Sequence, residues 1–157
     1  MILVVDASVA VKWFVPFNAE EANVDRAVTI LQHVGAGAVY LVQPPHFIAE
    51  VAAVLARLKP EKAVSDLVEL LHIPQRLIES AEVYGTALKL AKDFQHYLFD
   101  TLYQSVALHT PGSTLVTADK VYFARAKSRR QICLLKNFEL ASLHCRLWQS
   151  SPELVKD

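Results

Sequence analysis

Short, mostly apolar segments alternate along the chain with longer stretches in which apolar residues recur every three or four positions. The first segment, MILVV, contains no polar residue, which is typical of a parallel-sheet strand that is buried on both faces. Four further short segments complete a set of predicted strands, at residues 1–5, 39–42, 75–78, 114–117 and 132–135.

Between these strands the apolar spacing predicts helices. We expect Ser8 to cap a short helix after the first strand and Pro16 to end it. Pro44 and Pro45 are expected to open a later helix that Pro60 ends. Strands that alternate with helices predict a single α/β domain with a mostly parallel sheet, a core over about residues 1–135 and a less certain tail at 136–157. The other helices are predicted at residues 20–34, 61–72, 80–93, 98–109 and 119–127.

Composition narrows the possible functions. The 16 basic and 16 acidic residues cancel, so no global positive field attracts nucleic acid, and any such role must rest on a local site. Cys133 and Cys145 lack the spacing of a zinc site or of a disulfide framework, and we expect both to be reduced. Neither a signal peptide nor an apolar stretch of about 18 residues is evident, so a cytoplasmic protein without membrane association is expected.

The hydrophobic fraction of 53% is high for one small domain and predicts an additional apolar interface. Trp13, Phe14, Val15 and Phe17 cluster near the end of the first predicted helix. We expect them to form a groove or a dimer face, the alternative being that they belong to the core.

Four carboxylates lie in apolar surroundings. Asp6 ends the first predicted strand and Asp119 follows the fourth, so both are expected at the carboxyl edge of the sheet, where parallel sheets form their sites. Glu50 and Asp100 interrupt apolar helical segments. Each has a simpler explanation: Asp6 and Asp119 as helix caps, Glu50 as a surface charge and Asp100 as a partner of the helix dipole.

The combination of four acids favours a shared site. A buried carboxylate is costly unless it is paired or binds a cation, and no basic residue is near these acids in matching apolar surroundings. Mg²⁺ or Mn²⁺, which prefer oxygen ligands, would offset this cost and could activate a water molecule for attack on a phosphodiester.

The order of these motifs resembles the PIN-domain ribonucleases, and within them the VapC-type toxins of toxin–antitoxin pairs. The matching segments are the apolar strand followed by Asp-Ala-Ser, a glutamate in a proline-started helix, FDTLYQSVAL and LVTADK, spread over about residues 1–135. The resemblance implies a three-layer α/β/α sandwich, an acidic pocket that binds Mg²⁺ or Mn²⁺, and cleavage of single-stranded or loop RNA. It also implies a homodimer and a cognate antitoxin that covers the active site.

The same resemblance implies roles for individual residues. Asp6 and Asp100 match the direct metal ligands, Glu50 and Asp119 would complete the shell, and small hydroxyl positions fall at Ser8 and Thr117. The segment DFQHYLFD departs from the family because it lacks the glycine-containing turn often found before the third acid.

An acidic pocket repels RNA, so basic residues are needed nearby. A basic cluster follows the fourth acid and is expected to contact phosphates, although it could equally be a solvated helix face. Its members are Lys120, Arg125, Lys127, Arg129 and Arg130. Tyr103 and Tyr122 are more often core residues than base-stacking ones, and the six histidines are expected to be structural or exposed.

Two other classes of function remain open. The chain could be a PIN-like module that binds RNA or protein without catalysis. It could also be an α/β phosphatase or phosphoacceptor domain, but such phosphatases carry an Asp-x-Asp pair after the first strand, and Ser8 occupies the second position here.

Overall fold

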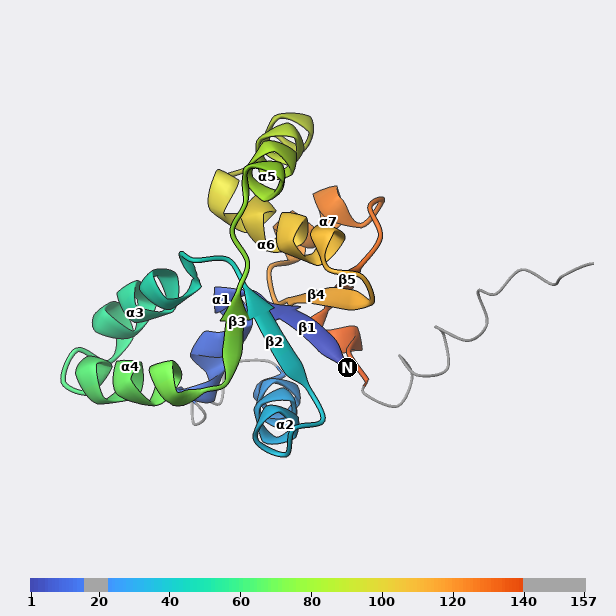
Figure 1. Cartoon of the computed structure of the whole chain (residues 1–157). Helices are drawn as coiled ribbons and strands as arrows, with labels where there is room; N and C mark the ends of the chain where they lie inside the picture. The colour runs from blue at the N-terminus through green and yellow to red at the C-terminus, as the bar shows by residue number, and fades with distance from the viewer. Residues whose placement is uncertain (16–22, 140–157) are drawn as a thin grey trace, which may run out of the picture.

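The computed structural model describes residues 1–15 and 23–139. Its centre is a five-stranded, fully parallel sheet in the order β3-β2-β1-β4-β5 (Figure 1). The strands are β1 (Ile2–Val5), β2 (Tyr40–Gln43), β3 (Gln75–Leu77), β4 (Ser113–Thr117) and β5 (Ile132–Leu134).

Strand β1 lies in the middle of the sheet because its residues are apolar on both faces. Leu3, Val4 and Val5 have no exposed surface. The register pairs Ile2 with Tyr40 of β2 on one side and with Ser113 of β4 on the other. Asp6, which directly follows β1, therefore lies at the middle of the carboxyl edge of the sheet.

Helices cover both faces of the sheet, which makes a three-layer α/β/α sandwich. Figure 1 shows α5, α6 and α7 on one side of the sheet and α2, α3 and α4 on the other. This division follows from right-handed crossovers that run in opposite directions from β1 to β2 and from β4 to β5. The helices are α1 (Ala7–Ala10), α2 (Val24–Gly35), α3 (Phe47–Leu58), α4 (Ala63–His72), α5 (Ala81–Phe94), α6 (Leu98–His109) and α7 (Lys120–Ala126), with 3₁₀ turns η1 (Val11–Trp13) and η2 (Leu135–Asn137).

Two expectations about the first helix are wrong. Asp6, not Ser8, is the N-cap of α1: its backbone is extended, and its side chain accepts a hydrogen bond from the Ser8 amide. Trp13 and Phe14 do not form an exposed face, because both are buried in the core and the Trp13 indole donates to the Ala27 carbonyl. Phe17 lies outside the described residues.

The end of the chain is described only in part. Phe138 is buried, and its carbonyl accepts a hydrogen bond from Arg26 on α2. The expectations for the tail from residue 140 onward, including Cys145, and for the helix start at residues 20–22 lie outside the described residues. Among the described helices, none combines the length and the apolar character that a membrane crossing requires.

Candidate active site

Asp6 is the most deeply buried of the four acids, with 5% of its surface exposed. Its Oδ1 accepts a hydrogen bond of 2.8 Å from the Ser8 amide, and its Oδ2 accepts one of 2.6 Å from the Thr117 hydroxyl at the end of β4. Burial raises the pKa of Asp6, these hydrogen bonds lower it, and the nearby charge of Asp119 raises it further. The buried carboxylate therefore accepts hydrogen bonds from uncharged groups, and these do not fully offset the free energy lost by removing its charge from water.

The end of β4 is tied to the end of β1 by both predicted hydroxyl residues. Thr117 Oγ1 donates to Asp6 and accepts from the Asp119 amide at 3.0 Å, and Ser8 Oγ accepts from the Ala118 amide at 3.1 Å. Asp119 itself caps α7, because its Oδ1 accepts from the amides of Val121 and Tyr122 at 2.7 and 2.9 Å. The capping explanation for Asp119 is thus correct, but it leaves the second carboxylate oxygen of Asp119 for another partner.

Glu50 lies in the first turn of α3 and points toward α6. Its Oε2 accepts a hydrogen bond of 2.7 Å from the Tyr103 hydroxyl and lies 3.5 Å from His46 Nε2. Burial raises the pKa of Glu50, the Tyr103 hydrogen bond lowers it, and the charges of Asp6 and Asp100 raise it.

Asp100 lies in the first turn of α6, with 22% of its side chain exposed. Its Oδ2 lies 3.0 Å from His96 Nε2, at ion-pair distance but without the alignment of a hydrogen bond. Burial, followed by the charges of Asp6 and Asp119, raises the pKa of Asp100 to about 6.

The charges of the four predicted acids therefore influence one another's pKa values. Asp6 is coupled to each of the other three, and Asp100 is also coupled to Glu50 and Asp119. The acids come from four segments, after β1, in α3, in α6 and after β4, that meet at the carboxyl edge of the sheet.

The chemistry of the cluster fits a hard divalent cation. All candidate ligands are carboxylate or hydroxyl oxygens, and the described hydrogen-bond partners of the buried Asp6 carry no positive charge. Within residues 1–15 and 23–139, however, no three His, Cys, Asp or Glu side chains converge closely enough to hold one ion as they stand. Joint ligation of one ion would therefore require some of these side chains to move.

The predicted basic cluster is only partly near the acids. Lys120 follows Asp119 directly and is exposed, whereas α7 then carries the chain about 10 Å back toward the start of β5. Arg125 donates hydrogen bonds to the carbonyls of Phe94 and Gln95 at the end of α5, and Arg129 pairs with Asp93 at 3.1 Å. The other two members, Lys127 and Arg130, are exposed in the same segment.

Sequence reasoning missed three residues of the site, His46, His96 and Tyr103. The two histidines were expected to be structural or exposed, but each lies against an acid. The available signal was the spacing, because each histidine precedes its acid by four residues. Tyr103, expected in the core, is indeed fully buried, and it also holds Glu50.

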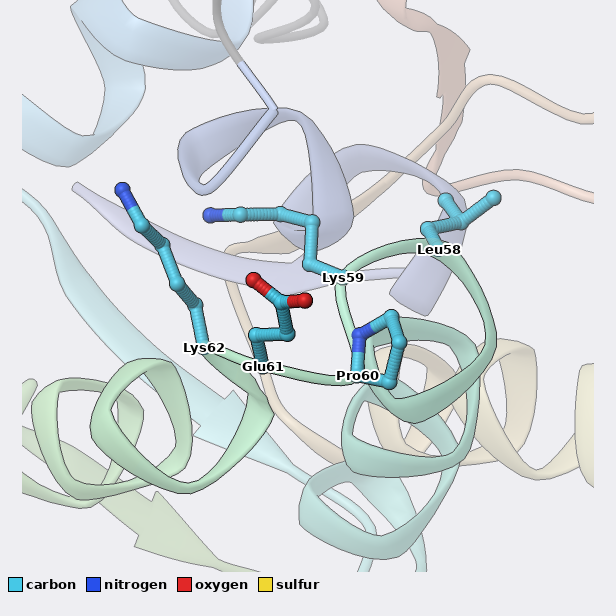
Figure 2. A pocket seen from close by; sticks show the side chains of 5 residues that line it. All are labelled: Leu58, Lys59, Pro60, Glu61 and Lys62. Carbon is cyan, nitrogen blue, oxygen red and sulfur yellow. The ribbon is translucent and has the colours of Figure 1, made fainter.

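Two pockets lie away from the acids. One, of about 400 Å³, is lined by Leu58, Lys59, Pro60, Glu61 and Lys62 at the turn between α3 and α4 (Figure 2). In it Lys59 Nζ donates to the Phe14 carbonyl and to Asp66 Oδ2, both at 2.6 Å, and so connects this turn to the end of η1 and to α4. The other, of about 550 Å³, lies at the opposite edge of the sheet, at the starts of β1, β2 and β3.

The fold and the site together define a class, a three-layer α/β/α domain that gathers carboxylates at the carboxyl edge of its parallel sheet. The model of the PIN domain matches residues 3–128 of the chain. The chain belongs to the PIN-domain family, whose members are generally nucleases that use divalent metal ions.

A solved structure gives the same fold. The chain is similar to one in the crystal structure of VapBC2 from Rickettsia felis bound to a DNA fragment from their promoter, with 17% identity and a TM-score of 0.58. The match covers 85% of this chain and 97% of the other. No curated protein matches in sequence.

Proposed function

We propose that this protein is a metal-dependent endoribonuclease that hydrolyses RNA phosphodiester bonds, and that it is the toxin of a toxin–antitoxin pair. The observation that carries the proposal is the cluster of four electrostatically coupled carboxylates around the buried Asp6. Membership of the PIN-domain family supports nuclease chemistry, and the VapBC2 neighbour supports the toxin assignment.

In this proposal Asp6 and Asp100 hold the ion, and Glu50 and Asp119 complete its surroundings. A bound Mg²⁺ or Mn²⁺ would supply positive charge to polarise the scissile phosphate and to lower the pKa of a water molecule. Glu50 or Asp119 would orient the attacking water and accept its proton, and the burial and neighbouring charges that raise the pKa of Glu50 favour Glu50 in this role. Thr117 and Ser8 fix the Asp6 carboxylate between the ends of β1 and β4.

The substrate phosphates require positive charge outside the acid cluster. Lys120 is the strongest candidate because it is exposed and adjacent to Asp119. Arg125, Lys127, Arg129 and Arg130 would act farther along the strand, with Arg125 and Arg129 partly engaged by α5.

The proposal includes a cognate antitoxin protein, a homodimer of the toxin and a cytoplasmic location. The antitoxin is tested by co-purification with a small protein encoded next to this chain. The homodimer is tested by the mass of the purified complex in solution. A stable monomer that no neighbouring gene product inhibits would refute the toxin assignment but not the nuclease.

The nuclease is tested by incubating the purified protein with single-stranded RNA in Mg²⁺, Mn²⁺ or EDTA and mapping the cut ends. We expect cleavage with either ion, none in EDTA, and none by Asp6→Asn. The matched control is Asp25→Asn, which removes one exposed carboxylate in the first turn of α2 and should cleave normally. Normal cleavage by Asp6→Asn would refute the proposal.

A further inference from the structure

Two aromatic rings are exposed beside the acid cluster. Tyr97 is 79% exposed and Phe99 is 59% exposed, and both lie within three residues of Asp100. Their segment is the one whose sequence departs from the usual turn before the third acid. Core packing does not explain exposed rings at this position, since a buried ring would be more stable.

Each exposed ring is the outer member of a row of three rings. Phe99 lies 5.1 Å from His46, whose ring is in turn 4.9 Å from Tyr103. Tyr103 is fully buried, so this row runs from solvent into the core and is anchored at its inner end. Because the Tyr103 hydroxyl binds Glu50, the row is also fixed relative to the acids.

The second row is built in the same way. Tyr97 lies 5.8 Å from His96, and the His96 ring is 5.1 Å from Tyr122 on α7. Tyr122 is 1% exposed, and burial, followed by the charges of Asp100 and Asp6, raises its pKa. His46 and His96 also contact Glu50 and Asp100, so the two rows flank the cluster.

A strand of RNA that enters this site meets electrostatic repulsion from four carboxylates, so part of its affinity must come from groups without negative charge. Unpaired bases supply such an interaction, because their flat faces stack on aromatic side chains whatever the sequence. Bases within a duplex are already stacked and cannot use it.

We propose that Tyr97 and Phe99 are base-stacking residues that hold unpaired nucleotides of the RNA beside the acid cluster. This inference rests on the proposed nuclease function. We favour RNA over a protein as the occupant because the histidines between these rings and the core contact Glu50 and Asp100, two of the acids to which the proposed function assigns the cleavage of an RNA phosphodiester.

The test measures the Kd of a short single-stranded RNA carrying 2-aminopurine, in EDTA at fixed ionic strength so that no cleavage occurs. We expect Phe99→Ala and Tyr97→Ala each to raise the Kd roughly ten-fold and to reduce the quenching of 2-aminopurine. Phe99→Tyr and Tyr97→Phe, which keep the rings, should bind as the parent does. Leu88→Ala is the matched control, because Leu88 is also 59% exposed but lies on α5.

The same variants are then assayed for cleavage in Mg²⁺. A rise in KM with little change in kcat, for single-stranded RNA alone, supports stacking. An unchanged Kd and unchanged quenching in both alanine variants would overturn the inference and assign the rings to a protein contact. Failure of the parent protein to cleave any RNA would instead refute the nuclease, so the two failures are distinguishable.

Discussion

Replacement of Asp100 by asparagine should stabilise the metal-free protein at neutral pH. Asp100 is partly buried beside two other carboxylates, and its pKa of about 6 lies above the ordinary value of 3.8. The folded state therefore binds a proton more tightly than the unfolded chain does. Stability contributed by the protonated form is present below pH 4 and is lost as the pH rises through about 6.

The size of the effect follows from the shift. A difference of about 2 pKa units corresponds to about 3 kcal/mol at pH 7. Solvent screening of the exposed part of the Asp100 side chain reduces this value. We therefore expect Asp100→Asn to gain about 1–3 kcal/mol at pH 7.5 and close to nothing at pH 4.

Urea unfolding in EDTA at several pH values measures the difference between the two proteins. Addition of Mg²⁺ should stabilise the parent and have a much smaller effect on Asp100→Asn, because ligand binding to the folded state adds stability. Asp66→Asn is the control with the opposite sign: Asp66 is buried but pairs with Lys59 at 2.6 Å, so its loss should destabilise the protein. A stability difference between Asp100→Asn and the parent that does not change from pH 4 to pH 7.5 would refute the electrostatic account.

Three further substitutions test individual contacts. Tyr103→Phe removes the 2.7 Å hydrogen bond to Glu50 and should lower kcat about ten-fold. Because that bond lowers the pKa of Glu50, the acid limb of the pH–rate profile should move to higher pH. An unchanged profile would leave Tyr103 only a packing role. Thr117→Val removes the hydroxyl that donates to Asp6 and should lower the cleavage rate at least ten-fold, whereas Thr117→Ser should retain activity. Equal loss of activity in both variants would contradict the role of the hydroxyl. Lys59→Met leaves Asp66 and the Phe14 carbonyl without their partner and should cost about 2–4 kcal/mol in urea unfolding, with cleavage by the folded fraction unchanged.

The sheet was predictable from sequence because most of its strands are short, mainly apolar runs bounded by polar or turn residues, although β3 has the mostly polar sequence QRL. All five predicted strands form, and the parallel arrangement is confirmed. Helix α6 occupies the predicted residues 98–109, since its apolar spacing is regular and Pro111-Gly112 follows. The PIN-domain resemblance is confirmed as well.

Details that depend on competing local contacts were not predictable in the same way. The segment Asp-Ala-Ser offers two residues able to cap α1, and the choice of Asp6 depends on its extended backbone. Arg125 was expected to face phosphates, but its contacts with the end of α5 depend on how α7 packs against that helix. The role of His46 likewise depends on Phe99 and Tyr103 of α6, which lie more than fifty residues away in the sequence.

The position of the acid cluster follows from the order of the strands. β1 and β4 are neighbours, but the crossovers that follow them run in opposite directions along the sheet, and parallel sheets form their sites at the carboxyl ends of such a pair of strands. Asp6 and Asp119 cap α1 and α7, which means that the carboxylates serve the fold and the site at once. Asparagine caps helices about as well as aspartate, so Asp6→Asn removes the charge and keeps the cap, whereas Asp6→Ala would remove both. Loss of cleavage in the asparagine variant, with the fold retained, is therefore the result that separates the chemical role of Asp6 from its structural one.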